Sequence, residues 1–157
     1  MTPSRLRRLR ADQQEMQAAF AGHRHISVVG TEGDPAERYL VEFRLRSLVP
    51  QGDDGQLVRS VHRAEIFLPL DYPRRPPFCR MTTPVFHPNI DPQKVCIGDH
   101  WSAGQPLAQL VVQIAEMLAF QSYNVQSPLN GKAAAWAVEN VERLPLDPSD
   151  LSSRTGG

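Results

Sequence analysis

The sequence predicts one α+β domain, in which a four-stranded antiparallel meander is covered by an N-terminal, a central and a C-terminal helix. The chain has 157 residues, of which 41% are hydrophobic, and this suits a single domain with one core. Short segments with strand-like alternation follow one another in the first half, and helical periodicity dominates the second. Strands joined by short loops favour an antiparallel meander.

The first element that we expect is a helix over residues 4–21. Apolar residues recur along it at helical spacing, and Gly22 suits its C-terminal cap. The stripe consists of Leu6, Leu9, Met16 and Phe20.

Four arginines crowd the first turns of this helix, where the helix dipole disfavours cations. Two interpretations are open: a solvated face, or a docking surface for an acidic partner. The arginines are Arg5, Arg7, Arg8 and Arg10. The whole chain has 17 basic and 17 acidic residues, and this balance argues against general nucleic-acid binding.

Four strands follow the first helix. A short one is expected at 26–29, and one at 39–46 alternates apolar and polar residues as a half-buried strand does. The turn residues at 50–55 separate it from a strand at 57–68, which Pro69 ends. The last strand, at 78–83, is entered from two prolines.

The second half begins with an irregular stretch at 84–105, and long loops of this kind are usually functional or disordered. Pro106 suits the first position of a central helix with a wide apolar stripe. Asn130 suits the N-cap of a last helix through Val141. We therefore expect a domain at 1–144 and a flexible tail at 145–157.

The chemistry of the sequence is concentrated around Cys96. Its thiol lies in a polar loop, and a thiolate is the best nucleophile among side chains. Asn89, a few residues earlier, carries an amide that is able to donate to an oxyanion. The other cysteine, Cys79, has apolar neighbours and is expected in the core. The segment is therefore typical of an acyl-transfer site.

Three motifs occur in order along residues 4–142. They are Tyr72-Pro73 with Pro76-Pro77, then His87-Pro88-Asn89 followed by Cys96 and Trp101, and then Ser127-Pro128-Leu129-Asn130. This ordered set resembles the ubiquitin-conjugating enzymes, which have the UBC fold, and the compact plan is most similar to their bacterial relatives.

The resemblance implies a role for each residue of the motifs. Cys96 would accept ubiquitin or a ubiquitin-like protein as a thioester, and Asn89 would stabilise the oxyanion or order the loop. Asp99 would position the incoming lysine, and Ser127 would gate it. Four more residues would gate the substrate or brace the loop: His87, Asn124, His100 and Trp101.

The resemblance also implies partners. These are an activating enzyme, the modifier and a ligase, although Ser102-Ala103-Gly104 stands where the family's ligase-docking loop has another sequence. No cofactor is expected, because ATP would act at the activating enzyme. The spacing of His and Cys residues predicts no zinc site, and no apolar run predicts a membrane span.

Two cysteines that lie 17 residues apart, with no CxxC motif, do not make a disulfide framework, and this favours the reducing cytoplasm. Bacterial relatives would place the chain in a ubiquitination-like pathway, with antiphage defence as one setting. Two alternatives remain: a non-catalytic binding module on the same fold, and a thiol hydrolase that uses Cys96 with His87 or His100. Non-catalytic variants lack the cysteine, and no acid in the sequence plainly orients either histidine.

Overall fold

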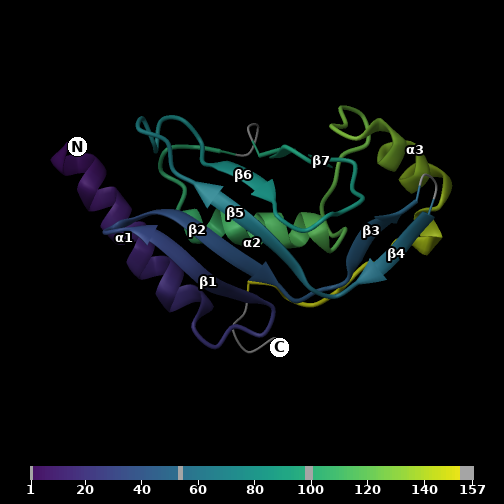
Figure 1. Cartoon of the computed structure of the whole chain (residues 1–157), viewed down its shortest axis with the longest axis horizontal. Coiled ribbons are helices and arrows are strands. Elements are labelled where there is room, and N and C mark those ends of the chain that lie inside the picture. Colours follow the sequence, from purple (N-terminus) through teal and green to yellow (C-terminus); the bar gives the residue numbers. More distant parts are fainter. Residues whose placement is uncertain (1, 53–54, 98–100, 153–157) are drawn as a thin grey trace.

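The computed structural model describes residues 2–52, 55–97 and 101–152. Its main sheet is antiparallel, and its strands follow the order of the sequence, so the predicted α+β meander is confirmed (Figure 1). The strands are β1 (Ile26–Gly33), β2 (Ala36–Phe43), β5 (His62–Phe67) and β6 (Phe78–Met81).

Two hairpins lie outside the main sheet. One joins β3 (Ser47–Gln51) to β4 (Gly55–Arg59), and the other joins β7 (Ile90–Asp91) to β8 (Lys94–Val95). The strand predicted at 57–68 is therefore two strands, and the one predicted at 39–46 ends at Phe43. The pairing of Phe43 with His62 is the last of the β2–β5 ladder. Beyond this pair, the two segments leave the main sheet side by side and pair again as β3 and β4. The strand-like sequence pattern therefore continues from one sheet into the other.

The helices are α1 (Pro3–Phe20), α2 (Leu107–Leu118) and α3 (Gly131–Glu139), and a 3₁₀ turn follows at Val141–Arg143. Thr2 caps α1 by accepting from the Arg5 N–H. Asn130 caps α3 as predicted, because its side chain accepts from the Ala133 N–H. Pro106 is the N-cap of α2, one residue before the position expected for it. None of the helices within the described ranges is long and apolar enough to cross a bilayer.

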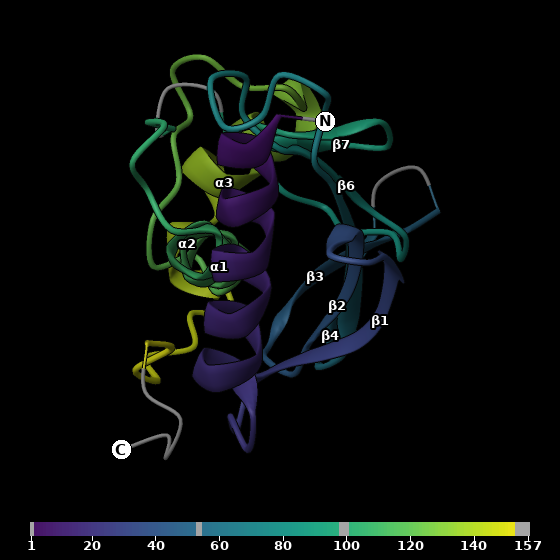
Figure 2. The same ribbon diagram turned by 90° about the vertical axis from the view of Figure 1, so that its left-hand side faces the viewer.

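The core lies between the sheet and the first two helices. Figure 2 shows α1 and α2 crossing on one side of the strands. Alternate residues of β2 and β5 point into this layer, and Val41, Phe43 and Ile66 are all fully buried. The opposite face of the sheet is charged: Glu65 pairs with Arg38 and Arg80, and Glu42 pairs with Arg63 and Arg44.

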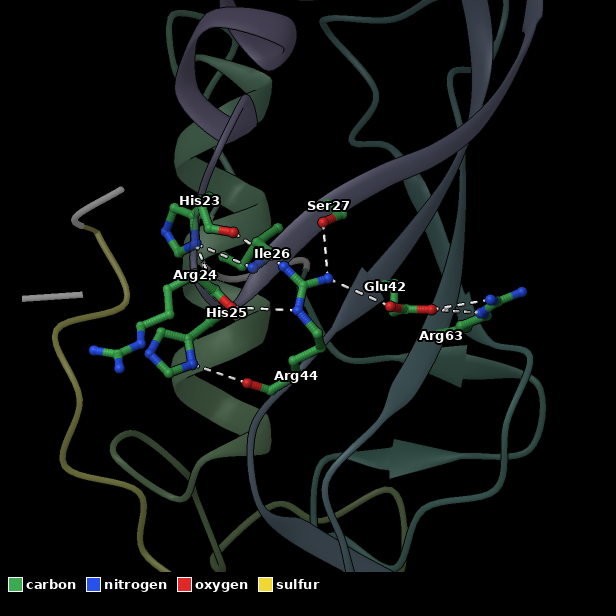
Figure 3. Close-up of polar contacts among 8 residues, drawn as sticks. All are labelled: His23, Arg24, His25, Ile26, Ser27, Glu42, Arg44 and Arg63. Atoms are coloured by element: carbon green, nitrogen blue, oxygen red, sulfur yellow. Dashed lines mark hydrogen bonds and ion pairs between the residues drawn. The ribbon is translucent and has the colours of Figure 1, made fainter. Parts of the chain in front are cut away.

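Arg44 joins the end of β2 to the loop between α1 and β1 (Figure 3). Its guanidinium donates to the His23 carbonyl at 3.0 Å and to Ser27 Oγ at 2.8 Å, and it is 3.3 Å from Glu42. The Arg63 guanidinium, with Arg44, holds the pKa of the Glu42 carboxyl below its ordinary value. This polar network fixes the loop that carries His23.

Residues 145–152, predicted as the start of a flexible tail, lie against the domain instead. Leu151 is 1% exposed, and His23 Nε2 donates to its carbonyl oxygen at 2.9 Å. Gln121 Nε2 donates to the carbonyls of Asp147 and Ser149. The polar composition of the segment concealed this docking, because one leucine and its backbone carbonyls make the contacts. The rest of the predicted tail, 153–157, lies outside the described residues.

Candidate active site

The β7–β8 hairpin brings Asn89 and Cys96 together. Asn89 directly precedes β7 and Cys96 directly follows β8, while Ile90 and Val95 are opposite each other in the hairpin. The ladder continues one step beyond the strands, because the Cys96 N–H donates to the Asn89 carbonyl at 3.0 Å. The spacing of the two residues in the sequence therefore follows from a tight antiparallel turn.

The two cysteines have different surroundings. Cys96 is partly exposed and lines a surface groove. Cys79, on β6, is 1% exposed, and burial raises the pKa of its thiol to about 12. Because the thiolate is the nucleophile, Cys79 is inert at neutral pH, and Cys96 is the thiol that a partner is able to reach.

Asn89 holds the loop between α2 and α3. Its side chain is 5% exposed and makes a pair of hydrogen bonds with the backbone of Asn124. Oδ1 accepts from the Asn124 N–H at 2.9 Å, and Nδ2 donates to the Asn124 carbonyl at 2.8 Å. The same loop is held at its other end, because the N–H groups of Leu129 and Asn130 donate to the Pro88 carbonyl.

Asn124 and Ser127 lie on this loop. The Asn124 side chain is directed to its own turn, where Oδ1 accepts from the Gln126 N–H at 2.7 Å. Ser127 is exposed. The contacts of Asn89 thus bring this loop to the β7 side of the hairpin that carries Cys96.

His87 is fully buried beneath the hairpin. Its Nδ1 accepts from the Asn89 N–H at 3.0 Å, so Nε2 carries the proton and donates to the Met117 carbonyl at 2.7 Å. Burial lowers the pKa of this imidazole to about 4. His87 is therefore a neutral brace between the hairpin and α2.

Trp101 is the first described residue after 98–100. Its Nε1 donates to the Pro73 carbonyl at 2.8 Å, and its ring lies 5.6 Å from that of Tyr72. These contacts fasten Trp101 to the turn after β5. Two residues to which the sequence assigned roles, Asp99 and His100, lie outside the described residues.

A buried polar cluster around Asp12 joins α1 to the turn after β5 and to the start of α2. The carboxylate is 2% exposed and accepts from Arg8 Nε at 2.8 Å, from the Tyr72 hydroxyl and from the Leu107 N–H at 3.2 Å. Arg8 also donates to the carbonyls of Ala103 and Gln105. We predicted no role for Asp12 from the sequence, although its position between Leu9 and Met16, within the apolar stripe, indicated a buried side chain.

The four N-terminal arginines divide into two pairs. Arg5 is buried and donates to the carbonyls of Leu68 and Pro69, and Arg8 belongs to the Asp12 cluster. Both therefore hold α1 onto the domain. Arg7 and Arg10 are exposed, and the docking prediction now concerns these two.

The described residues contain no group of three or more His, Cys, Asp or Glu side chains that could hold a metal ion.

The family model that describes ubiquitin-conjugating enzymes matches residues 32–144. The chain therefore belongs to the ubiquitin-conjugating enzyme family, a family of transferases that need no cofactor of their own.

Individual relatives agree with this assignment. The chain is 31% identical over 122 residues to "Ubiquitin-conjugating enzyme E2 N" of Drosophila melanogaster, which covers 74% of this chain and 78% of the relative. A protein of the same name from Macaca fascicularis is 27% identical over 122 residues, again 74% of this chain and 78% of the relative. The E2 domain of a Toxoplasma gondii ubiquitin-conjugating enzyme superposes with a TM-score of 0.59 at 24% identity, covering 86% of this chain and 87% of that one, and it shows the fold.

Proposed function

We propose that the protein accepts ubiquitin or a ubiquitin-like protein from an activating enzyme as a thioester on Cys96 and transfers it to an amine. The observation that carries the proposal is the partly exposed thiol of Cys96 at the end of the β7–β8 hairpin, in a chain whose other thiol is buried. Because a thioester is already activated, positioning of the amine supplies much of the rate. ATP acts at the activating enzyme.

Asn89 and Ser127 serve this reaction from the β7 side. Asn89 holds loop 121–130 in place through Asn124. These hydrogen bonds favour the role of ordering the loop; in the alternative role, the second N–H of the amide would donate to the oxyanion. Ser127, on the same loop, gates the incoming amine, and Asp99 positions it.

The two alternatives receive less support. A non-catalytic module would not need an accessible thiol at this position. A hydrolase would need a histidine base; both ring nitrogens of His87 are engaged with the backbone, and His100 lies outside the described residues. The pathway that we propose is a bacterial ubiquitination-like one in the cytoplasm, with antiphage defence as one setting and a ligase as a further partner. Neighbouring genes for an activating enzyme and a glycine-terminated ubiquitin-like protein would support it, and their absence would count against it.

The test of the thioester uses the cognate activating enzyme, ATP and modifier, with electrophoresis in the presence and absence of reducing agent. The native chain should form an adduct that reducing agent cleaves. Cys96→Ser should form at most a stable ester and Cys96→Ala none, whereas Cys79→Ala should load normally. Loading that survives Cys96→Ala and disappears in Cys79→Ala would overturn the assignment.

A further inference from the structure

The docked segment 145–152 forms a strap that joins two parts of the domain far apart in the chain. Near its middle, the Gln121 side chain donates to two of its carbonyls. At its end, the Leu151 side chain belongs to the main core, and the Leu151 carbonyl accepts from His23 Nε2 at 2.9 Å. The strap therefore connects the end of α2 to the loop between α1 and β1.

The contact near the middle of the strap fixes the start of loop 121–130, which receives the amine in the proposed reaction. Gln121 Nε2 donates to the carbonyls of Asp147 and Ser149 at 2.6 and 2.8 Å. The Asp147 N–H donates to the Ala119 carbonyl at 3.2 Å, directly after α2. The segment before β7 holds the middle and the far end of the same loop. The strap thus supplies a third fixed point, at the start of the loop.

His23 holds the end of the strap as a neutral imidazole. Its side chain is 4% exposed, and Nδ1 accepts from the N–H groups of His25 and Ile26 at 2.9 and 3.0 Å (Figure 3). Nε2 therefore carries the proton that is donated to the Leu151 carbonyl. In an imidazolium both ring nitrogens are donors, so a proton on Nδ1 would point at two N–H groups. Protonation is therefore incompatible with this position of the ring.

The surroundings of the ring also favour its neutral form. The charged and titratable groups around it come from its own loop, from the residue after β2 and from the strap: Arg24, His25, Arg44 and Asp150. Burial lowers the pKa of His23 most, and the charges of His25 and Arg44 act in the same direction. The Leu151 carbonyl and the Asp150 carboxylate oppose them, and Asp150 interacts in turn with Glu116 on α2.

The direction of the pH dependence follows from this pKa. A released His23 titrates near its ordinary value of 6.5, whereas the ring that holds the strap takes up its proton only at lower pH. The hold of the ring on the strap is therefore complete above about pH 6.5 and weakens as the pH falls below it.

We propose that the strap positions the loop that receives the amine, and that protonation of His23 loosens the strap. The inference rests on the proposed function and adds a regulation of its second step. With the strap in place, loop 121–130 presents the amine in one geometry. When the strap is released, the start of the loop moves, and discharge slows, because positioning supplies much of the rate. Loading involves no amine and stays unchanged.

Loosening of the strap is measured first, by hydrogen exchange and mass spectrometry, because this does not depend on a thioester. Exchange is compared at about pH 7.5 and about pH 5.5, roughly one unit on either side of the ordinary pKa of histidine, after correction for the intrinsic effect of pH on amide exchange. In the native chain, residues 145–152 should lose protection roughly fivefold at the lower pH.

Two histidine variants test whether His23 is the group that titrates. His23→Gln has a side-chain N–H but no titrating group, so the acid dependence of strap exchange should disappear. His62→Gln is the matched control, at a buried histidine that bonds the Arg59 carbonyl instead, and it should keep the native acid dependence.

Discharge to free lysine is measured second, on chain charged with the modifier at neutral pH. Leu151→Ala releases the strap, and Gln121→Ala breaks its contact with the loop. Each should slow discharge roughly tenfold and leave loading unchanged. The double variant should be no slower than either single one, because both remove the same contact. Leu146→Ala, at the 50% exposed leucine of the strap, is the matched control and should discharge as the native chain does.

The results that would overturn the inference are distinct from those that would overturn the proposed function. A native strap that keeps its protection in acid, or a native acid dependence in His23→Gln, would show that His23 does not hold the strap. Native discharge rates in Gln121→Ala and Leu151→Ala, or equal slowing of loading and discharge, would show that the strap does not position the loop. Failure of the native chain to form any adduct on Cys96 would overturn the proposed function, and the exchange experiment would still decide the role of His23.

Discussion

At the scale of single residues, His87 is a buried imidazole whose two ring nitrogens both bond the backbone. Since the folded chain keeps this imidazole neutral down to a pKa of about 4, only the unfolded chain takes up a proton near the ordinary value of 6.5. The folded state should therefore have its full stability above about pH 6.5 and lose up to about 3 kcal/mol as the pH falls toward 4.

The measurement is urea unfolding of the native chain and of His87→Gln at several pH values. His87→Gln should be less stable at pH 7 but should lose less stability on acidification. The pKa values of His23 and His62 are also lowered by burial, so part of the acid sensitivity should remain in the variant. Equal acid sensitivity in both proteins would show that His87 does not titrate as described.

Asn89 is the residue whose role the structure shifts most toward bracing. Because both of its amide atoms bond the Asn124 backbone, Asn89→Ala removes both hydrogen bonds from the part-buried Asn124 N–H and carbonyl. The free energy of unfolding should fall by about 1–3 kcal/mol, and loading and discharge should both slow. An unchanged melting temperature with discharge alone slowed about 10²–10³-fold would instead assign the residue to the oxyanion.

At the scale of elements, Asp12 joins α1, the turn after β5 and the start of α2. Asp12→Ala removes the acceptor of the buried Tyr72 hydroxyl and Leu107 N–H and the ion-pair partner of the partly buried Arg8, so it should cost about 3–5 kcal/mol. Asp71→Ala is the matched control, because the Asp71–Arg75 pair is exposed and should be worth less than about 1 kcal/mol. Chemical unfolding of both variants tests this difference, and similar losses would show that the cluster does not hold the elements together.

The exposed face of α1 is expected to dock an acidic partner through Arg7 and Arg10. Replacing both with glutamine should raise the concentration of activating enzyme needed for half-maximal loading, and added salt should have the same effect on the native chain. Arg59→Gln, an exposed arginine on β4, is the control. If loading ignores both the substitutions and the salt, this helix face is merely solvated.

Local sequence patterns predicted most of the helices and strands, but not the tertiary contacts that these elements make. The cap Asn130 and the apolar stripe of α2 act within a few residues, so helices were predictable, as were strands with period two. The division of 57–68 into β4 and β5 was not, because the chain changes sheets without changing its alternation. Arg5 was interpreted as part of a solvated or docking face and Asp12 was given no role, since the Leu68 carbonyl and the Leu107 N–H that they bond are 63 and 95 residues away in the chain.

At the scale of the whole molecule, the motifs around Cys96 were predictable because the hairpin that joins Asn89 to Cys96 is local in sequence. The groove was not, since Phe67, Phe78 and Cys96 come from three separate segments that only the fold brings together. The docking of residues 145–152 was missed for the same reason: His23, Ala119 and Gln121 hold it from distant elements.

The central claim is that Cys96 is an acyl carrier, and intact-mass measurement tests it most directly. Two acyl donors are used, and neither needs an activating enzyme. One is a thioester of ubiquitin with a small thiol, and the other is the same thioester of the cognate modifier. The account predicts one added modifier, lost on treatment with hydroxylamine, present in Cys79→Ala and missing in Cys96→Ala. A native chain that gains no modifier from either donor, or a Cys96→Ala variant that still gains one, would contradict it.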